Sequence, residues 1–218
     1  MRNKLKKIKE IIENGEIERV GIKLGEGDNA VVYKIFDDFN VKIFKKFNSI
    51  GRVTKKNDFA VLEDLAGTYM FPEVYIHKEG EYIIKEHIEG NTIINIFETF
   101  FKDKDLYFIE EFIDDFTNDL IDIYDYCIYN GYIPYDINHS NIIVRNDCSL
   151  CVIDVGNFKK FSNIKGEEGY ITDEEGEEID ELMRKNIDEV VGFLRSRFLK
   201  LCELNDLSIE EIIWYISR

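Results

Sequence analysis

The sequence predicts an α+β protein with two lobes: an N-terminal antiparallel sheet that carries one helix, and a reduced, largely helical C-terminal lobe. Short β-prone runs crowd into the first part of the chain, and the longest stretch of helical periodicity lies in the second half. The pattern changes at the dipeptide Glu89-Gly90. We therefore expect an amphipathic helix within residues 1–16, one lobe over residues 17–88 and the other over residues 89–218.

The composition is that of a globular protein with an acidic balance. Of the 218 residues, 44% are hydrophobic and 33% are charged, which is enough apolar material for a core. The 28 Lys and Arg residues against 44 Asp and Glu residues give a net charge of −16, and such a field repels nucleic acid and anionic membranes. We expect a cytoplasmic protein that binds no nucleic acid, because no apolar run is long enough for a membrane span and the charged N-terminus does not resemble a signal peptide.

Two local features have a simple and a functional interpretation. The acidic stretch over residues 167–181 could be a solvated loop or could bind a basic partner. Cys148 and Cys151 have the spacing of zinc ligands, but a second pair is missing and strand alternation would place the two thiols on opposite faces. We expect a solvated loop and reduced thiols.

The elements follow from apolar periodicity and turn signals, taken in chain order. The N-terminal lobe is expected to contain a helix over residues 3–14, strands over 20–24, 30–36 and 39–44, a helix over 55–66, and strands over 73–77 and 81–86. The C-terminal lobe is expected to contain a long helix over residues 105–129, strands over 142–145 and 150–154, a helix over 178–200 and a last helix from Ser208. The dipeptide Asn130-Gly131 predicts a left-handed end to the long helix.

The first candidate site is the sequence GEGDN over residues 25–29, which runs into Ala30. It lies between two expected strands instead of between a strand and a helix, which argues against a dinucleotide-binding fold. Backbone amides around Gly25 and Gly27 could cover phosphates. The alternative is an ordinary hairpin turn.

Lys42 is the second candidate, and it lies among apolar neighbours on the strand after the glycine turn. There its ammonium group could pair with phosphates and be oriented by a carboxylate of the following helix. The alternative is an edge lysine that points to water.

Three further polar residues follow the long helix. Asp136 and Asn141 are five positions apart in the expected loop between that helix and a strand, where a carboxylate can accept a hydroxyl proton and an amide oxygen can hold a metal ion. Asp154 ends an apolar strand and is followed two positions later by Gly156, which suits Mg²⁺. The alternatives are an Asx-rich turn and a simple strand-ending turn.

These features occur in one order, and together they resemble the protein kinase-like family. The resemblance covers about residues 17–160 and is closest to the small atypical members, the RIO/Bud32-like and aminoglycoside-phosphotransferase-like proteins. It implies a two-lobed protein kinase-like fold and transfer of the γ-phosphoryl group of ATP to a hydroxyl, with Mg²⁺ as the metal.

The resemblance also implies a role for each matching residue. Lys42 and Asp136 would be catalytic, the lysine on the α- and β-phosphates and the aspartate as the base or as the group that orients the hydroxyl. Asn141 and Asp154 would hold Mg²⁺. The remaining nucleotide-binding positions would be Gly25, Gly27 and Ala30 in the turn, Asp58 on the helix, and Glu86 and Ile88 in the hinge.

The resemblance also places the adenine-binding hinge and the helical partner of Lys42. The backbone from Glu86 to Ile88 would hydrogen-bond adenine, with Lys85 in the position before it. The helical partner of Lys42 is expected to be Asp58, which lies within about 40° of the inward Leu62 and Leu65 at 100° per residue, with Glu63 as the second choice.

The chain departs from the family pattern around Asp136. Tyr135 stands where the family has arginine and Asn138 where it has lysine, while His139 could touch phosphate or cap the loop. No Ala-Pro-Glu segment follows Asp154. Three functions stay open: an atypical serine/threonine protein kinase, which we prefer, a small-molecule kinase, and a nucleotide-binding pseudokinase. The hydroxyl acceptor would accordingly be a protein or a small molecule.

Overall fold

The computed structural model describes residues 10–17, 21–37, 40–48, 56–160, 173–205 and 207–208. The chain divides into two compact units. The first unit is Met1–Gly67 with Pro72–Ile88, and the second is Thr68–Phe71 with Glu89–Arg218.

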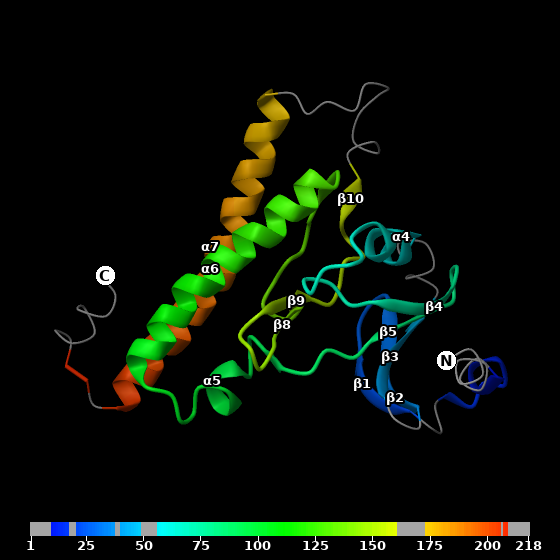
Figure 1. The fold of residues 1–218 in the computed structure, drawn as a ribbon, viewed down its shortest axis with the longest axis horizontal. Helices are drawn as coiled ribbons and strands as arrows, with labels where there is room; N and C mark the ends of the chain where they lie inside the picture. Colours follow the sequence, from blue (N-terminus) through cyan, green and yellow to red (C-terminus); the bar gives the residue numbers. More distant parts are fainter. Residues whose placement is uncertain are drawn as a thin grey trace. The chain divides into compact units, whose positions relative to one another are not determined.

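The first unit is built on a five-stranded antiparallel sheet (Figure 1). The strands lie in the order β1-β2-β3-β5-β4. Their bounds are β1 Ile22–Glu26, β2 Ala30–Asp37, β3 Asn40–Phe47, β4 Val74–Lys78 and β5 Tyr82–Glu86. Strands β1 and β2, β2 and β3, and β4 and β5 pair across the turns that the sequence predicts, and β3 pairs with β5. Gly80 closes the β4–β5 turn with a φ of 78°.

The two faces of this sheet bury different kinds of side chain. One face carries an apolar cluster, against which Ile11 and Ile12 from the helical residues 10–13 pack. The buried members of that cluster are Ile17, Tyr33, Ile35, Phe44, Tyr82 and Ile84. The other face meets helix α4, Lys56–Asp64.

Helix α4 turns its apolar residues inward, as the sequence predicts. Val61, Leu62 and Leu65 are almost completely buried, whereas Glu63 is exposed. Phe59 stacks on His77 of β4, with 3.4 Å between ring centroids and 15° between ring planes, and this contact fixes the helix to the edge strand.

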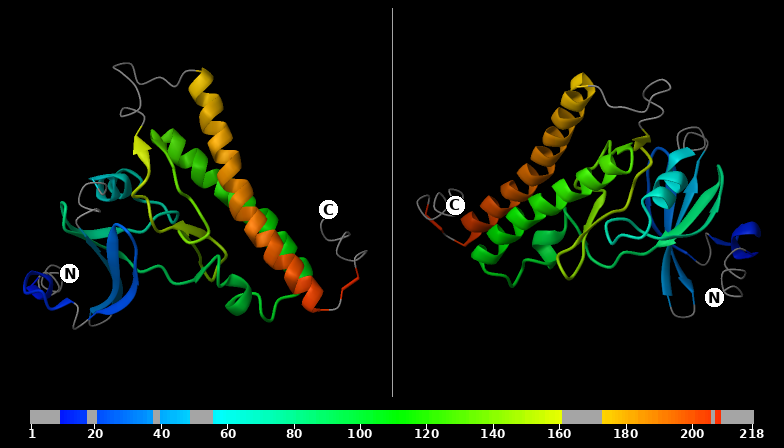
Figure 2. Two further views of the ribbon diagram at one scale, coloured as in Figure 1. Left: turned by 180° about the vertical axis from the view of Figure 1, so that it is seen from behind. Right: turned by 45° about the horizontal axis from the view of Figure 1, so that its top comes forward.

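The second unit is dominated by two long helices that lie side by side in Figures 1 and 2. They are α6, Leu106–Tyr129, and α7, Asp173–Leu204. The N-terminus of α6 is capped by Asp105, whose carboxylate accepts the Phe108 N–H at 2.7 Å. The helix ends at the predicted point, because Gly131 has the left-handed φ of 79° that stops it.

Short strands complete the second unit. Strands β6 Asn91–Thr92, β8 Ile142–Val144 and β9 Leu150–Val152 form one antiparallel sheet in the order β6-β8-β9, and β7 Tyr132–Ile133 pairs with β10 Lys159–Lys160. The short helix α5, Ile96–Thr99, leads into an aromatic cluster around the buried Phe101. Gly90 is required where it stands: its φ is 157°, and a Cβ atom there would come within 2.2 Å of the Val144 carbonyl oxygen.

The structure confirms the α+β class, the N-terminal antiparallel sheet and the long elements. Helix α7 is several residues longer at both ends than the predicted range of 178–200, and β6, β7, β10 and α5 were not predicted. Residues 3–9 of the first predicted helix, the helix from residue 209 on, and residues 167–172 of the acidic stretch lie outside the described residues. Residues 173–181 of that stretch belong to helix α7, so the expected loop is wrong for this part. Among the helices that the structure describes, none combines the length and hydropathy needed to cross a bilayer.

Candidate functional site

Asp136 lies in the turn between β7 and β8 and adopts an unusual backbone conformation. Its φ is 65°, in the left-handed region that residues other than glycine rarely enter. The turn is held by side-chain amides: Asn141 Nδ2 donates to the Asp136 carbonyl oxygen at 3.0 Å, and the Asn138 Oδ1 atom accepts the Ser140 N–H at 2.9 Å. The neighbouring Ile137 is buried, so the loop is anchored while Asp136 itself stays exposed.

Both oxygens of the Asp136 carboxylate accept a hydrogen bond from an asparagine. Asn138 Nδ2 donates to Oδ1 at 2.7 Å, and Asn157 Nδ2 donates to Oδ2 at 2.9 Å. Each carboxylate oxygen has capacity for a second bond. The exposed carboxylate can therefore still accept a proton from a hydroxyl while both asparagines remain bonded to it.

The side chain of Asn141, a predicted Mg²⁺ ligand, is held by the same turn. Its amide nitrogen is bonded to the Asp136 carbonyl oxygen, and within the described part of the chain its Oδ1 atom accepts no hydrogen bond. Its backbone carbonyl accepts the Ile153 N–H at 2.8 Å, which places Asn141 next to the segment that carries Asp154. Amide and carboxylate oxygens are both ligands that Mg²⁺ accepts.

Asp154 begins a tight turn after β9. Its Oδ1 atom accepts the Gly156 N–H at 3.2 Å, and the Phe158 N–H donates to the Val155 carbonyl oxygen at 3.0 Å. Within the ranges that the structure describes, no group of three or more His, Cys, Asp or Glu side chains is arranged around a metal position. A cation here would therefore be held by Asp154 and Asn141 together with ligands from outside the chain, which is how Mg²⁺ is usually bound with phosphates.

In the first unit, the lysine that pairs with helix α4 is Lys45. Its Nζ atom lies 2.9 Å from Asp58 Oδ2, and the two side chains are only 9% and 5% exposed. Asp58 is buried on the inward face of α4, as expected, and the exposed Glu63 is not in an equivalent position.

This pair corrects the expected pair of Asp58 with Lys42. Lys42 lies opposite Ile35 on β2 and opposite Glu86 on β5, so it points to the sheet face that carries the apolar cluster. Its Nζ atom lies 5.0 Å from the centroid of the Tyr75 ring. Lys45 is three positions further along the strand and points to the other face, because side chains alternate along a strand.

The face that carries Lys45 also carries other residues of the predicted nucleotide site. Lys45 lies opposite Val32 on β2 and Ile83 on β5, and Lys85 shares this face because it lies two positions after Ile83. Lys85 is 6% exposed and Ala30 is also 6% exposed. This face therefore holds two buried lysines and α4, whereas the opposite face carries the apolar cluster and the equally buried Lys42.

The glycine turn between β1 and β2 is closed by backbone bonds. The Gly27 N–H donates to the Ala30 carbonyl oxygen at 3.0 Å, and Asn48 Nδ2 donates to the Asp28 carbonyl oxygen at 2.6 Å. Neither Gly25 nor Gly27 has a positive φ, and a Cβ atom at either would meet nothing within 4 Å. The turn geometry itself does not need glycine at these positions, and the space above them is open.

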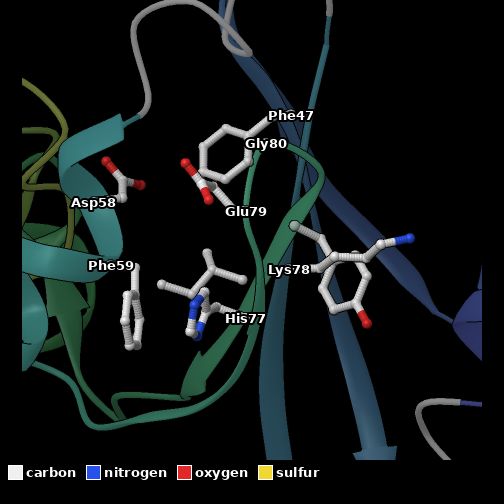
Figure 3. A pocket seen from close by; sticks show the side chains of 9 residues that line it. Phe47, Asp58, Phe59, His77, Lys78, Glu79 and Gly80 are labelled. Carbon is white, nitrogen blue, oxygen red and sulfur yellow. The ribbon is translucent and has the colours of Figure 1, made fainter.

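A pocket of about 230 Å³ lies between α4 and the β4–β5 turn (Figure 3). In the figure, the stacked rings of Phe59 and His77 form one wall, and Asp58 projects from α4 at its end. The other residues that line it are Phe47, Lys78, Glu79, Gly80, Tyr82 and Ile83. The pocket therefore reaches the Lys45–Asp58 pair from the side of the edge strand.

The expected hinge is partly used by the sheet. The Glu86 N–H donates to the Glu73 carbonyl oxygen at 2.8 Å, and the Glu73 N–H donates to Glu86 Oε2 at 3.2 Å. An adenine contact with this segment would therefore use backbone groups other than the Glu86 N–H. Those of the buried Ile88 are also among the predicted contacts.

The departures from the family pattern have local explanations. His139 stacks on Phe193 of α7, with 4.6 Å between the ring centroids and 10° between the planes, which favours a packing role. Lys159 Nζ lies 4.5 Å from the centroid of the Tyr135 ring. Asn157 was not a predicted site residue, since no local spacing marks it.

Comparisons with known proteins give limited support to these features. The chain matches no protein-family model. It is similar to a protein of Bacillus subtilis (strain 168) named "Putative serine/threonine-protein kinase YrzF", with 26% identity over 137 residues, which is 63% of this chain. The chain spans 59% of the length of that relative.

Proposed function

We propose that this protein is an ATP- and Mg²⁺-dependent phosphotransferase, and specifically an atypical serine/threonine protein kinase. The observation that carries the proposal is the arrangement around Asp136, an exposed carboxylate whose two oxygens are fixed by amides and whose turn also orients Asn141. The name of the Bacillus subtilis relative favours a protein acceptor.

In the proposed reaction, the acceptor hydroxyl oxygen bonds to the γ-phosphorus of ATP as the bond to the bridging oxygen breaks and ADP leaves. Asp136 orients the hydroxyl and takes its proton. Asn141 and Asp154 would hold Mg²⁺, which when bound neutralises charge on the phosphates. Catalysis then consists mainly of positioning and electrostatic stabilisation.

The strand lysine in this proposal is Lys45. The expected role was that of a lysine oriented by a helix carboxylate, and Lys45 has that carboxylate in Asp58. It lies on the same sheet face as Val32 and Ala30, which follow the glycine turn. The open space above Gly25 and Gly27 suits close approach of phosphate oxygens to backbone amides.

The test incubates the purified protein with Mg²⁺ and γ-labelled ATP, adding desalted lysate protein to one sample and the small-metabolite fraction to another. The Asp136→Ala variant is the inactive control. Asp103→Ala, which removes an exposed carboxylate of the same unit, is the matched control. We expect label on protein with the wild type and Asp103→Ala, and none with Asp136→Ala.

Other outcomes separate the alternatives. Label confined to small molecules would replace the protein kinase with a small-molecule kinase. If no label is transferred but ATP still raises the melting temperature, a pseudokinase becomes the better proposal. Transfer by Asp136→Ala at the wild-type rate would overturn the assignment of this loop.

A further inference from the structure

We propose that Asn157 is a positioning residue for phosphoryl transfer, because its side-chain amide holds the Asp136 carboxylate in its working orientation. The inference rests on the proposed function and adds to it a residue that neither the sequence pattern nor the similarity assigns. Asn157 and Asp136 are 21 positions apart and meet through the 2.9 Å bond from Nδ2 to Oδ2.

The Asp136 carboxylate needs two fixed points to have one orientation. A single hydrogen bond, such as the 2.7 Å bond from Asn138 to Oδ1, leaves the group free to rotate about that bond. The bond from Asn157 to Oδ2 adds the second point and removes that rotation. Asn138 lies in the same turn as Asp136, so among the described residues it is Asn157 that holds the carboxylate from a different segment.

Asn157 is exposed, but it stands in a short turn between two buried residues. The residues on either side of its turn are anchored: Val155 is 1% exposed, Phe158 is 0% exposed, and the Phe158 N–H donates to the Val155 carbonyl oxygen. The Phe158 ring packs edge-on against Phe71, with centroids 6.3 Å apart. The short segment between these anchors has little freedom to move the amide away from Asp136.

The chemistry of an amide suits this task. A carboxamide donates a hydrogen bond and carries no net charge, so it orients the carboxylate without supplying a full neutralising charge. A lysine or arginine at this position would compete with the acceptor hydroxyl for the same oxygen by forming an ion pair. Asn157 also ties the Asp136 turn to the turn that begins at Asp154, so the proposed base and metal ligand keep a fixed spacing.

The first arm of the test does not depend on activity. The side-chain amide signals of Asn157 are followed by NMR in the wild type and in Asp136→Ala, which removes the acceptor. We expect the Asn157 signals to shift and their exchange with water to quicken in the variant, whereas those of the exposed Asn146 stay unchanged. Unchanged Asn157 signals would show that the bond is absent in solution and would overturn the proposal.

The second arm measures kinetics. Asn157→Leu keeps the size of the side chain but removes the donor, and Asn157→Gln keeps a carboxamide. We expect Asn157→Leu to lower kcat by about tenfold to a hundredfold with the KM for ATP within about twofold of the wild type. Asn157→Gln should recover part of that loss. Asn146→Leu is the matched control and should leave kcat unchanged.

Two kinetic outcomes would overturn the proposal. One is an Asn157→Leu variant whose kcat stays within about twofold of the wild type. The other is an equal loss in Asn157→Leu and Asn157→Gln, accompanied by lower melting temperatures, since that would indicate a purely structural role. If the wild type transfers no phosphate at all, the proposed function fails, and the NMR arm still decides whether Asn157 holds Asp136.

Discussion

The Lys45 ammonium nitrogen lies 2.9 Å from Asp58 Oδ2, and this ion pair joins β3 to α4 with both side chains almost completely buried. A buried pair of opposite charges is strongly destabilised when one partner is removed, because the other is left buried and uncompensated. Replacement of both partners by apolar residues is far less harmful.

The stability of the first unit should therefore respond asymmetrically to changes at this pair. Asp58→Ala should lower the free energy of unfolding by about 3–5 kcal/mol, and the double variant Lys45→Met/Asp58→Leu should recover most of the loss. Urea unfolding of the two variants and the wild type measures both values. A double variant as unstable as Asp58→Ala would show that the charges themselves are needed for folding.

Nucleotide binding should distinguish Lys45 from Lys42, which both lie on β3. We expect Lys45→Met to weaken ATP binding by at least about tenfold, as loss of a charge-assisted contact to phosphate predicts, and Lys42→Met to change it by less than about threefold. Calorimetric titration with ATP and Mg²⁺ measures both. The reverse order would return the phosphate-binding role to Lys42.

The two lysines also show where the sequence stops being informative. Both lie on one strand among apolar residues, and the sequence alone does not say which faces α4. Their faces depend on the register of β3 against β2 and β5, because a shift of one residue exchanges the two sides of a strand. By contrast, α6 was predicted closely, because a long apolar repeat and the following Asn130-Gly131 define both the helix and its end.

Asn157 and the shortest strands were missed for a related reason. The bond from Asn157 to Asp136 spans 21 positions, so neither residue has a local pattern that indicates the other. Strands β7 and β10 have two residues each, which is too short for any alternation to appear. Asp136, Asn141 and Asp154 could be proposed from the sequence because each follows or precedes a recognisable element, and their roles stay predictions.

Glycine substitutions should separate binding from stability. Gly27→Ala should change the free energy of unfolding by less than about 0.5 kcal/mol, because a Cβ atom there meets open space, but it should weaken ATP binding. Gly90→Ala should destabilise the protein by more than about 2 kcal/mol, because the new Cβ atom would overlap the Val144 carbonyl oxygen. Thermal unfolding with and without ATP measures both. A Gly27→Ala variant that binds ATP normally would favour an ordinary hairpin turn.

Stability should fall in alkaline solution through Cys127. Burial raises the pKa of its thiol from 9.0 to about 12. Above pH about 9 the unfolded chain loses this proton and the folded chain keeps it, so the free energy of unfolding falls by up to about 1.4 kcal/mol per pH unit until about pH 12. Urea unfolding between pH 8 and pH 11 should give a shallower decline for Cys127→Ala. An identical pH dependence would indicate that other groups cause the decline.

The buried position of Lys45 has a consequence for amine chemistry. An ammonium group must lose its proton and meet the reagent before it can be alkylated or acylated, and Lys45 is both shielded from solvent and engaged with a carboxylate. Exposed lysines such as Lys159 meet neither obstacle. A small amine-reactive reagent should therefore modify Lys45 slowly, and only when α4 moves away from β3. The rate of this modification, measured by mass spectrometry, would report how often that local opening occurs.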